Sequence, residues 1–236
     1  MTPRGVGLLD RYFYFFMSLL IAVVVVYGFS HTVNKNLIHA DVPRPLIVFI
    51  HAAIFSGWVL FFIFQSALVQ THNVRLHRLT GWFGVALGVL VPVLGVSTAI
   101  TMSHFHIMHD PTIDANDVAS FLIVSFYDMT AFTVPFALAI YWRRKPEFHR
   151  RLLLLATCAL TSAAFARFPF VPFVWLYSAV DLLILLGVAR DLSVNRRIHV
   201  VYLYGLPALI LGQSVAMYTF THSLAYWLRL GQAILR

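Results

Sequence analysis

The chain has 236 residues, of which 60% are hydrophobic and only 11% are charged. A soluble domain carries about 25% charged residues, so this composition excludes an ordinary soluble core and requires lipid to cover much of the apolar surface. The formal net charge is +8. The cations flank apolar runs and no nucleic-acid motif accompanies them, so we expect contact with a lipid bilayer and its anionic headgroups, not with nucleic acid.

The apolar runs are long and continuous, which favours membrane helices over a barrel of alternating residues. Seven of them approach the length of about 20 residues that a spanning helix needs. The first has no small-residue cleavage site after it, so we interpret it as a retained helix. We predict an all-α, seven-transmembrane-helix bundle forming a single domain over residues 1–236, with spans at 11–29, 45–69, 80–102, 118–142, 149–169, 171–189 and 198–218. The amphipathic stretch 223–236 is predicted to lie in the membrane interface.

Loop charges predict the orientation of this bundle. Five cations fall on one side, namely Lys35, Arg44, Arg167, Arg229 and Arg236. Twelve fall on the other side, namely Arg4, Arg11, Arg75, Arg78, Arg143, Arg144, Lys145, Arg150, Arg151, Arg190, Arg196 and Arg197. Because cytoplasmic loops collect Lys and Arg, we expect the N-terminus inside and the C-terminus outside.

Two stretches on the predicted inner side are alike. RLHRLTGW around His77 and EFHRRLLLLAT around His149 each place His-Arg at the start of a span. This pattern fits either a duplicated hairpin or convergence at a membrane boundary.

With HAAIFSGWVLFFIFQ from His51, YDMTAF and ARFP, these motifs resemble a family of bacterial multi-span proteins catalogued only as a domain of unknown function. The similarity covers roughly the second to fifth spans. It implies a helical bundle in the bacterial cytoplasmic membrane and no particular activity. It also gives weight to His51, Gln65, His77, Arg78, Asp128, His149, Arg150 and Arg167.

Five polar side chains fall within or at the ends of the predicted spans, where a polar group is costly and is therefore a functional candidate. Judged by depth, they could converge on one outer-half cavity that holds a small-molecule ligand. They are His51, Asp128, Arg167, Asp181 and Gln213. An Arg facing two carboxylates would lower the cost of burying each charge. The alternative is a structural network that fixes helix packing, since polar contacts commonly join membrane helices.

The predicted outer loop between the third and fourth spans contains the run SHFHIMHD. Imidazole and carboxylate are suitable ligands for zinc or copper. The candidate metal ligands are therefore His104, His106, His109 and Asp110. The spacing is not specific to metal sites, so a plain polar loop remains the alternative.

A second cofactor hypothesis concerns His77 and His149, at matching depth on the third and fifth spans. Paired histidines from neighbouring helices hold b-type haem in helical bundles. The helix arrangement is distantly similar to that of b561-type cytochromes. The fourth span contains no histidine to face His51, so the second haem of that pattern is not expected.

Three functions remain open. The first is a redox or sensing component that binds haem b or a divalent metal through histidines. The second is an intramembrane zinc-dependent hydrolase similar to seven-span ceramidases, although His222 stands alone where those enzymes have HxxxH. The third is a small transporter or sensor that uses Asp128 and Asp181. Retinal binding is excluded because no lysine lies within a span, and the absence of GxxxxGK[ST] excludes a phosphate-loop ATPase.

Overall fold

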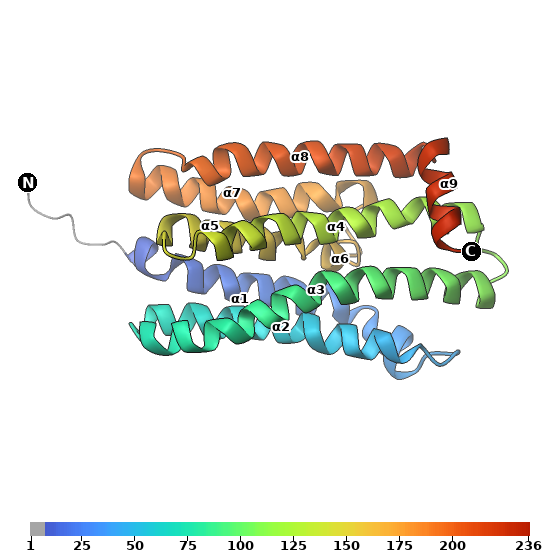
Figure 1. Ribbon diagram of the computed structural model, residues 1–236, viewed down its shortest axis with the longest axis horizontal. Coiled ribbons are helices and arrows are strands. Elements are labelled where there is room, and N and C mark those ends of the chain that lie inside the picture. Colours follow the sequence, from blue (N-terminus) through green and yellow to red (C-terminus); the bar gives the residue numbers. More distant parts are fainter. Residues whose placement is uncertain (1–7) are drawn as a thin grey trace, which may run out of the picture.

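The computed structural model describes residues 8–236, whose helices run side by side along one long axis (Figure 1). Within these residues there are no strands. Six of the described helices are long and apolar enough to cross a membrane. They are α1 (Leu8–Ser30), α2 (Leu46–Gln70), α3 (Val74–His109), α4 (Ala115–Tyr141), α7 (Leu176–Asn195) and α8 (Val200–Thr221). The predicted all-helical, membrane-compatible fold is confirmed.

Short polar caps determine where the helices begin. The Asn73 side chain accepts a hydrogen bond from the backbone N–H of Leu76 at the start of α3. Asp114 caps α4 in the same way, accepting from the Asn116 N–H at 2.8 Å. Because α3 continues to His109, the histidines expected in a loop lie on its last turns, and only a short turn separates it from α4.

The fifth predicted span is interrupted. It consists of α5 (Pro146–Ala159) and the one-turn helix α6 (Ser162–Phe165). A short 3-10 helix, η2 (Phe173–Trp175), then leads into α7. In Figure 1, α6 lies partway along the bundle, and it packs against α1. Irregular backbone at membrane depth is tolerated where it is buried in protein or lines a cavity, and this segment does line one.

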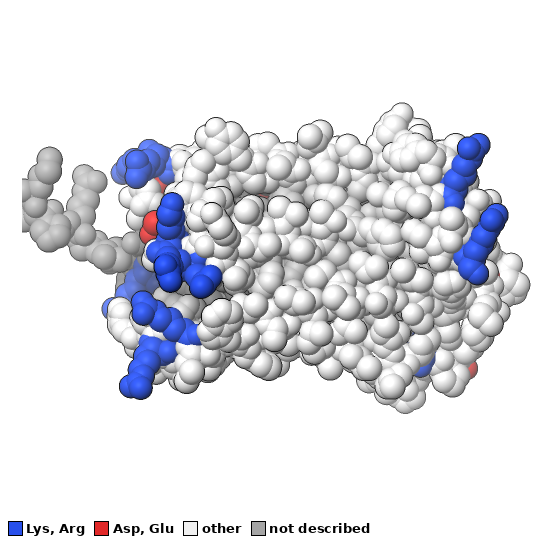
Figure 2. Space-filling view, in the orientation of Figure 1, with Lys and Arg blue, Asp and Glu red and all other residues white. Residues whose placement is uncertain are grey.

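The two ends of the bundle differ in charge. Figure 2 shows Lys and Arg gathered at the end where α1 begins, followed by a long uncharged belt and only a few cations at the opposite end. We call the first the cation-rich end. It contains the α2–α3, α4–α5 and α7–α8 connections, with Arg75, Arg78, Arg143, Arg144, Lys145, Arg196 and Arg197. Arg4, also predicted on this side, lies outside the described residues.

Two of the cations assigned to this side are not loop charges. Arg151 and Arg190 are 0% and 2% exposed. Arg151 donates from Nε and Nη2 to the two carboxylate oxygens of Asp191, at 2.8 and 2.5 Å, and from Nη1 to Glu147 at 2.6 Å. Arg190 also donates to Asp191, at 2.8 Å. This buried network joins α5 to α7 and offsets the cost of each buried charge.

The C-terminal stretch forms α9 (Ala225–Ile234), which lies at the end opposite the cation-rich end (Figure 1). It packs on the start of α4, where Gln232 donates to the side-chain oxygen of Asn116 at 2.8 Å. Of its own side chains, Trp227 is buried, whereas Tyr226 and Leu230 are exposed. The predicted amphipathic helix is therefore present. Its place in the membrane interface stays a prediction.

Candidate functional site

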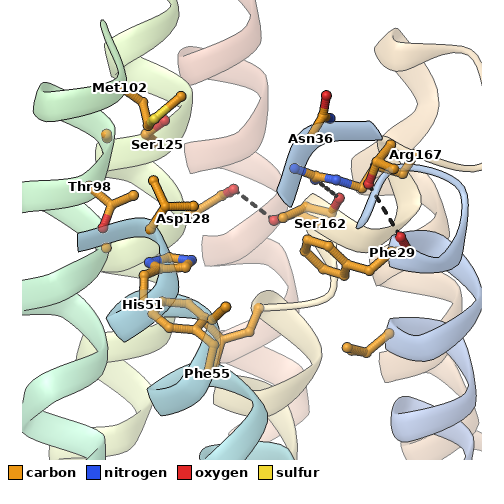
Figure 3. A pocket seen from close by; sticks show the side chains of 18 of the residues that line it. Phe29, Asn36, His51, Phe55, Thr98, Met102, Ser125, Asp128, Ser162 and Arg167 are labelled. Carbon is orange, nitrogen blue, oxygen red and sulfur yellow. Dashed lines mark hydrogen bonds between the residues drawn. The ribbon is translucent and has the colours of Figure 1, made fainter. Parts of the chain in front are cut away.

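A cavity of about 1260 Å³ lies between α1, α2, α3, α4 and the α5–α6 segment. Its lining comes from the later halves of α1 and α3 and the earlier halves of α2 and α4, so it occupies the half of the bundle away from the cation-rich end. Pockets for small molecules usually measure about 300–1,000 Å³, so this one is large enough for a lipid-like chain. Figure 3 shows polar side chains entering it from several elements.

Three of the five predicted polar residues line this cavity, namely His51, Asp128 and Arg167. Asp128 points toward Ser162 at the start of α6 (Figure 3) and accepts a hydrogen bond from its hydroxyl at 2.7 Å. Its other carboxylate oxygen accepts from the Tyr177 hydroxyl at 2.8 Å. Both oxygens are therefore engaged, and the side chain ties the interrupted segment and α7 to α4.

Several polar atoms in the cavity wall lack a protein partner. The buried atoms His51 Nδ1, Trp58 Nε1 and Thr98 Oγ1 have no hydrogen bond to any described residue. The His51 ring is held by stacking on Phe55, with centroids 3.9 Å apart. Leaving a buried polar group unsatisfied costs about 1–3 kcal/mol. These atoms therefore remain available to a bound molecule or to water inside the cavity.

Two arginines contribute positive charge to the same cavity. Arg167 lies over the Phe29 ring, 4.3 Å from its centroid, and donates to the carbonyl of Ala163. Arg44 lies over Phe105 and donates to a backbone carbonyl at 3.3 Å. Neither forms an ion pair with a described residue. An arginine remains charged even when it is largely buried. Both guanidinium groups can therefore still accept an anion as a partner.

Asp181 and Gln213 do not join this site. Gln213 donates from Nε2 to Asp181 Oδ1 at 3.0 Å, which links α8 to α7. Neither lines the cavity. The prediction of one five-residue cluster is therefore wrong for this pair. Depth along a helix predicted where the two groups lie, but the direction that each faces around its helix depends on packing.

The metal site predicted near the end of α3 is not assembled. Among the described residues, no group of three or more His, Cys, Asp or Glu side chains is placed to hold a metal ion. His104 lies with its ring nitrogens 3.0 and 3.2 Å from the carbonyls of Ile100 and Leu235. The His109 Nδ1 bonds the carbonyl of Phe105 at 2.9 Å. Carbonyls engage both ring nitrogens of His104, and His109 has no set of donors beside it that could complete a metal site among the described residues.

The other two members of that set have different roles. Asp110 closes the turn after α3, where it accepts from the hydroxyl and the N–H of Thr112, at 2.6 and 3.0 Å. These hydrogen bonds hold the pKa of its carboxyl below the usual value. His106 lines the cavity. The acidic residue that suggested a metal is therefore a turn-forming residue.

The histidines at the cation-rich end separate into a pair and two single residues. His77 and His149 come together, with ring centroids 6.4 Å apart. His199 instead caps α8, since its Nδ1 accepts from the Val201 N–H at 3.2 Å. His72 occupies the turn before α3 with a φ of 61°. Only the first two are placed to share a ligand.

Sequence reasoning missed Arg44, Ser162 and Tyr177 as members or supports of the cavity. Arg44 was counted only as a loop charge, and a serine or tyrosine in an apolar run carries no distinctive signal. The resemblance to bacterial proteins of unknown function and the likeness to b561-type cytochromes stay predictions. No family model, curated protein or solved structure matches this chain.

Proposed function

We propose that this protein is an integral membrane carrier or sensor that binds an amphipathic anion in the cavity between α1, α2, α3, α4 and α5–α6. The observation that carries the proposal is the combination of a large, mostly apolar cavity with two arginines that have no carboxylate partner among the described residues. The apolar wall suits a hydrocarbon chain, and the arginines suit its charged head.

The charge expected on the ligand's head group follows from which charged side chains of the cavity have no ion-pair partner among the described residues. Asp128 has both oxygens engaged by Ser162 and Tyr177, so it offers little to a cationic ligand. Arg167 and Arg44 present planar donors, which match carboxylate or phosphate oxygens. The unsatisfied His51 Nδ1 and Thr98 Oγ1 provide further hydrogen-bonding positions along the wall. A single-chain acid fits this arrangement.

The same proposal includes the membrane topology. In it, α5 and α6 together form a fifth, interrupted crossing, so the chain spans seven times with the N-terminus inside and the C-terminus outside a bacterial cytoplasmic membrane. The uneven charge of the two ends supports this orientation (Figure 2). The cavity then lies in the outer half, within reach of molecules from the outer leaflet or from outside.

Two of the other predicted functions receive less support. A catalytic zinc site uses three protein ligands plus water, and the described residues do not assemble such a set. A transporter that relies on Asp128 and Asp181 as one pair is disfavoured because these residues have separate partners. A redox role depends on His77 and His149, which lie outside the cavity.

The test is binding of a fluorescent single-chain carboxylic acid to the full-length protein in nanodiscs, compared with the corresponding alcohol. We expect saturable binding of the acid and weaker binding of the alcohol. Arg167→Gln should weaken acid binding on the order of tenfold, the effect of losing one charge-assisted hydrogen bond. It should leave alcohol binding unchanged.

Arg229→Gln is the matched control, because Arg229 is exposed on α9 and does not line the cavity. It should bind the acid as the unmodified protein does. Equal affinities for acid and alcohol would contradict the proposal, as would equal losses in the two arginine variants. Empty nanodiscs report the partition of each probe into lipid, and thermal melting shows whether each variant is folded.

A further inference from the structure

Two histidines from different helices meet toward the cation-rich end, outside the cavity. The ring centroids of His77 on α3 and His149 on α5 lie 6.4 Å apart, and the ring planes are at 78°. Neither residue lines the cavity. The proposed binding of an amphipathic anion therefore leaves this pair without a role.

His149 is oriented as a metal ligand would be. Its Nδ1 lies 2.9 Å from the carbonyl oxygen of Ala139. A carbonyl can only accept, so Nδ1 carries the proton and the lone pair of Nε2 stays available. Nearly every metal-ligating histidine has a partner of this kind, which fixes its tautomer and ring direction.

His77 has a nitrogen that no described residue satisfies. Its Nδ1 is buried without a hydrogen bond to the described part of the chain. The backbone of Gln65 on α2 interacts with this ring too weakly to satisfy Nδ1. The Gln65 side chain has a buried Oε1 that also lacks a partner among the described residues, while its amide donates to Thr80 at 2.7 Å. Buried polar atoms are rarely left unsatisfied. Both atoms therefore remain available to a bound group or to water.

The separation of the ring centroids leaves room for one ion between them. Metal–nitrogen bonds of about 2 Å on each side place the centres of two opposed imidazoles about 6 Å apart. Among the described residues, no Asp or Glu joins the two histidines in a group that could hold a metal ion. Ions that require oxygen ligands are therefore disfavoured, whereas imidazole suits iron, copper and zinc.

We propose that His77 and His149 together bind one transition-metal ion, each through one imidazole nitrogen. The ion is either free or the iron of a haem, because both offer two opposed positions to imidazole ligands. The site has two protein ligands, which agrees with the finding that no larger group of donors is assembled among the described residues. A metal ion bound there would connect the start of α3 to α5.

The experiment is metal analysis and absorption spectroscopy of the full-length protein, purified in detergent and then offered haemin, Cu(I) or Zn(II) separately. The proposal expects one of these probes to bind stoichiometrically. A Soret band that sharpens and shifts on reduction identifies haem iron, and bound metal without this band identifies a free ion. His77→Ala and His149→Ala should each lose the bound metal.

Two further variants separate loss of the ligand from loss of the fold. His72→Asn changes a neighbouring exposed histidine to a residue that also tolerates positive φ, and it should keep the metal. His149→Met replaces one ligand by a thioether that also binds haem iron and copper. It should keep iron or copper with an altered spectrum, whereas a zinc site should be lost.

The proposal is overturned if folded protein binds none of the three probes, or if His77→Ala and His149→Ala bind as tightly as the unmodified chain. Binding of the fluorescent acid is measured on the same preparations. Retained acid binding without a metal would contradict only the histidine site. Metal binding without acid binding would contradict only the cavity function.

Discussion

Asp128 shows how one side chain can support a helical segment that is not continuous. Its carboxylate accepts hydrogen bonds from Ser162 on α6 and Tyr177 on α7. The break between α5 and α6 frees backbone groups at a depth where water is scarce. By fixing Ser162, Asp128 holds this break against α4, so it is a structural residue that also lines the cavity.

Asp128→Asn should therefore lower thermal stability, because asparagine offers one acceptor oxygen where Asp128 uses two, and a buried donor left unsatisfied costs about 1–3 kcal/mol. Ser162→Ala should lower it less, since one of the two bonds to Asp128 remains. The double variant should lose clearly less than the sum of the two single losses, because both remove the same contact. Melting of all four proteins in nanodiscs measures this coupling. Strictly additive losses would show that the two side chains act independently.

At the scale of elements, α6 packs closely against α1 because α1 has a glycine, with no side chain, at the point of contact. A Cβ on Gly28 would overlap the backbone carbonyl oxygen of Ala164. Small residues at such contacts let membrane helices approach closely. This glycine thus determines how near the interrupted segment lies to α1, which borders the cavity.

Gly28→Ala should destabilise the protein by about 1–3 kcal/mol, the usual cost of overpacking against a rigid backbone. Gly57 on α2 is the matched control, because a Cβ there would meet nothing within 4 Å. Gly57→Ala should leave melting nearly unchanged or raise it slightly. The comparison uses thermal melting in nanodiscs. Equal effects of the two substitutions would mean that the α1–α6 contact is not tight.

The start of α8 gives a pH dependence with a definite sign. His199 accepts a hydrogen bond from the Val201 N–H through Nδ1, which requires the neutral ring. Burial is the largest cause that lowers its pKa below the ordinary 6.5. Above pH 6.5 this cap contributes fully. As the pH falls, the unfolded chain binds a proton first, so the contribution is lost through the lowered pKa of the folded state.

His199→Asn should keep the cap, since asparagine is among the best N-cap residues, and should remove this titration. We expect the melting temperature of the unmodified protein to fall more than that of the variant between pH 7 and pH 5. The difference between the two curves isolates His199 from other titrating groups. Parallel curves would show that the cap does not depend on its protonation.

At the scale of the whole molecule, the interrupted α5–α6 segment decides the number of crossings. If it crosses, the C-terminus lies on the side opposite the α7–α8 connection and the N-terminus. If it returned without crossing, α7 and α8 would have the reverse orientation, and their connection would not lie at the cation-rich end, where Figure 1 shows it. Loop charge favours crossing, because Arg196 and Arg197 then share the cation-rich side.

Alkaline phosphatase fused after residue 236 should be active, because that enzyme folds only in an oxidising compartment. The same reporter fused after Asn195 should be inactive, and green fluorescent protein should give the opposite pattern at both positions. Activity at 195 combined with inactivity at 236 would contradict the seven-crossing proposal.

The buried network of Arg151, Arg190 and Asp191 shows that not every cation counted from the sequence is a loop charge that bears on membrane orientation. Both arginines look like boundary cations in sequence, yet they are buried and paired between α5 and α7. Sequence cannot distinguish the two cases, because a span end and a loop differ there only in packing. The excess of cations at that end remains without these two (Figure 2).

The sequence by itself determined the helical class, the approximate limits of six long helices and the depth of each polar residue. These follow from local properties, namely the length of apolar runs, helix caps and the charges beside them. It also predicted that His77 and His149 lie at matching depth, which the structure confirms as a contact.

Only the tertiary structure decided which polar groups share a space. It separated Asp181 and Gln213 from the cavity and interrupted an apolar run that sequence reads as one helix. It also placed the histidines expected in the loop after the third span, His104, His106 and His109, on the last turns of α3. The physical reason is that depth along a helix is set by sequence position, whereas the direction a side chain faces and the place where a buried helix breaks depend on neighbouring helices.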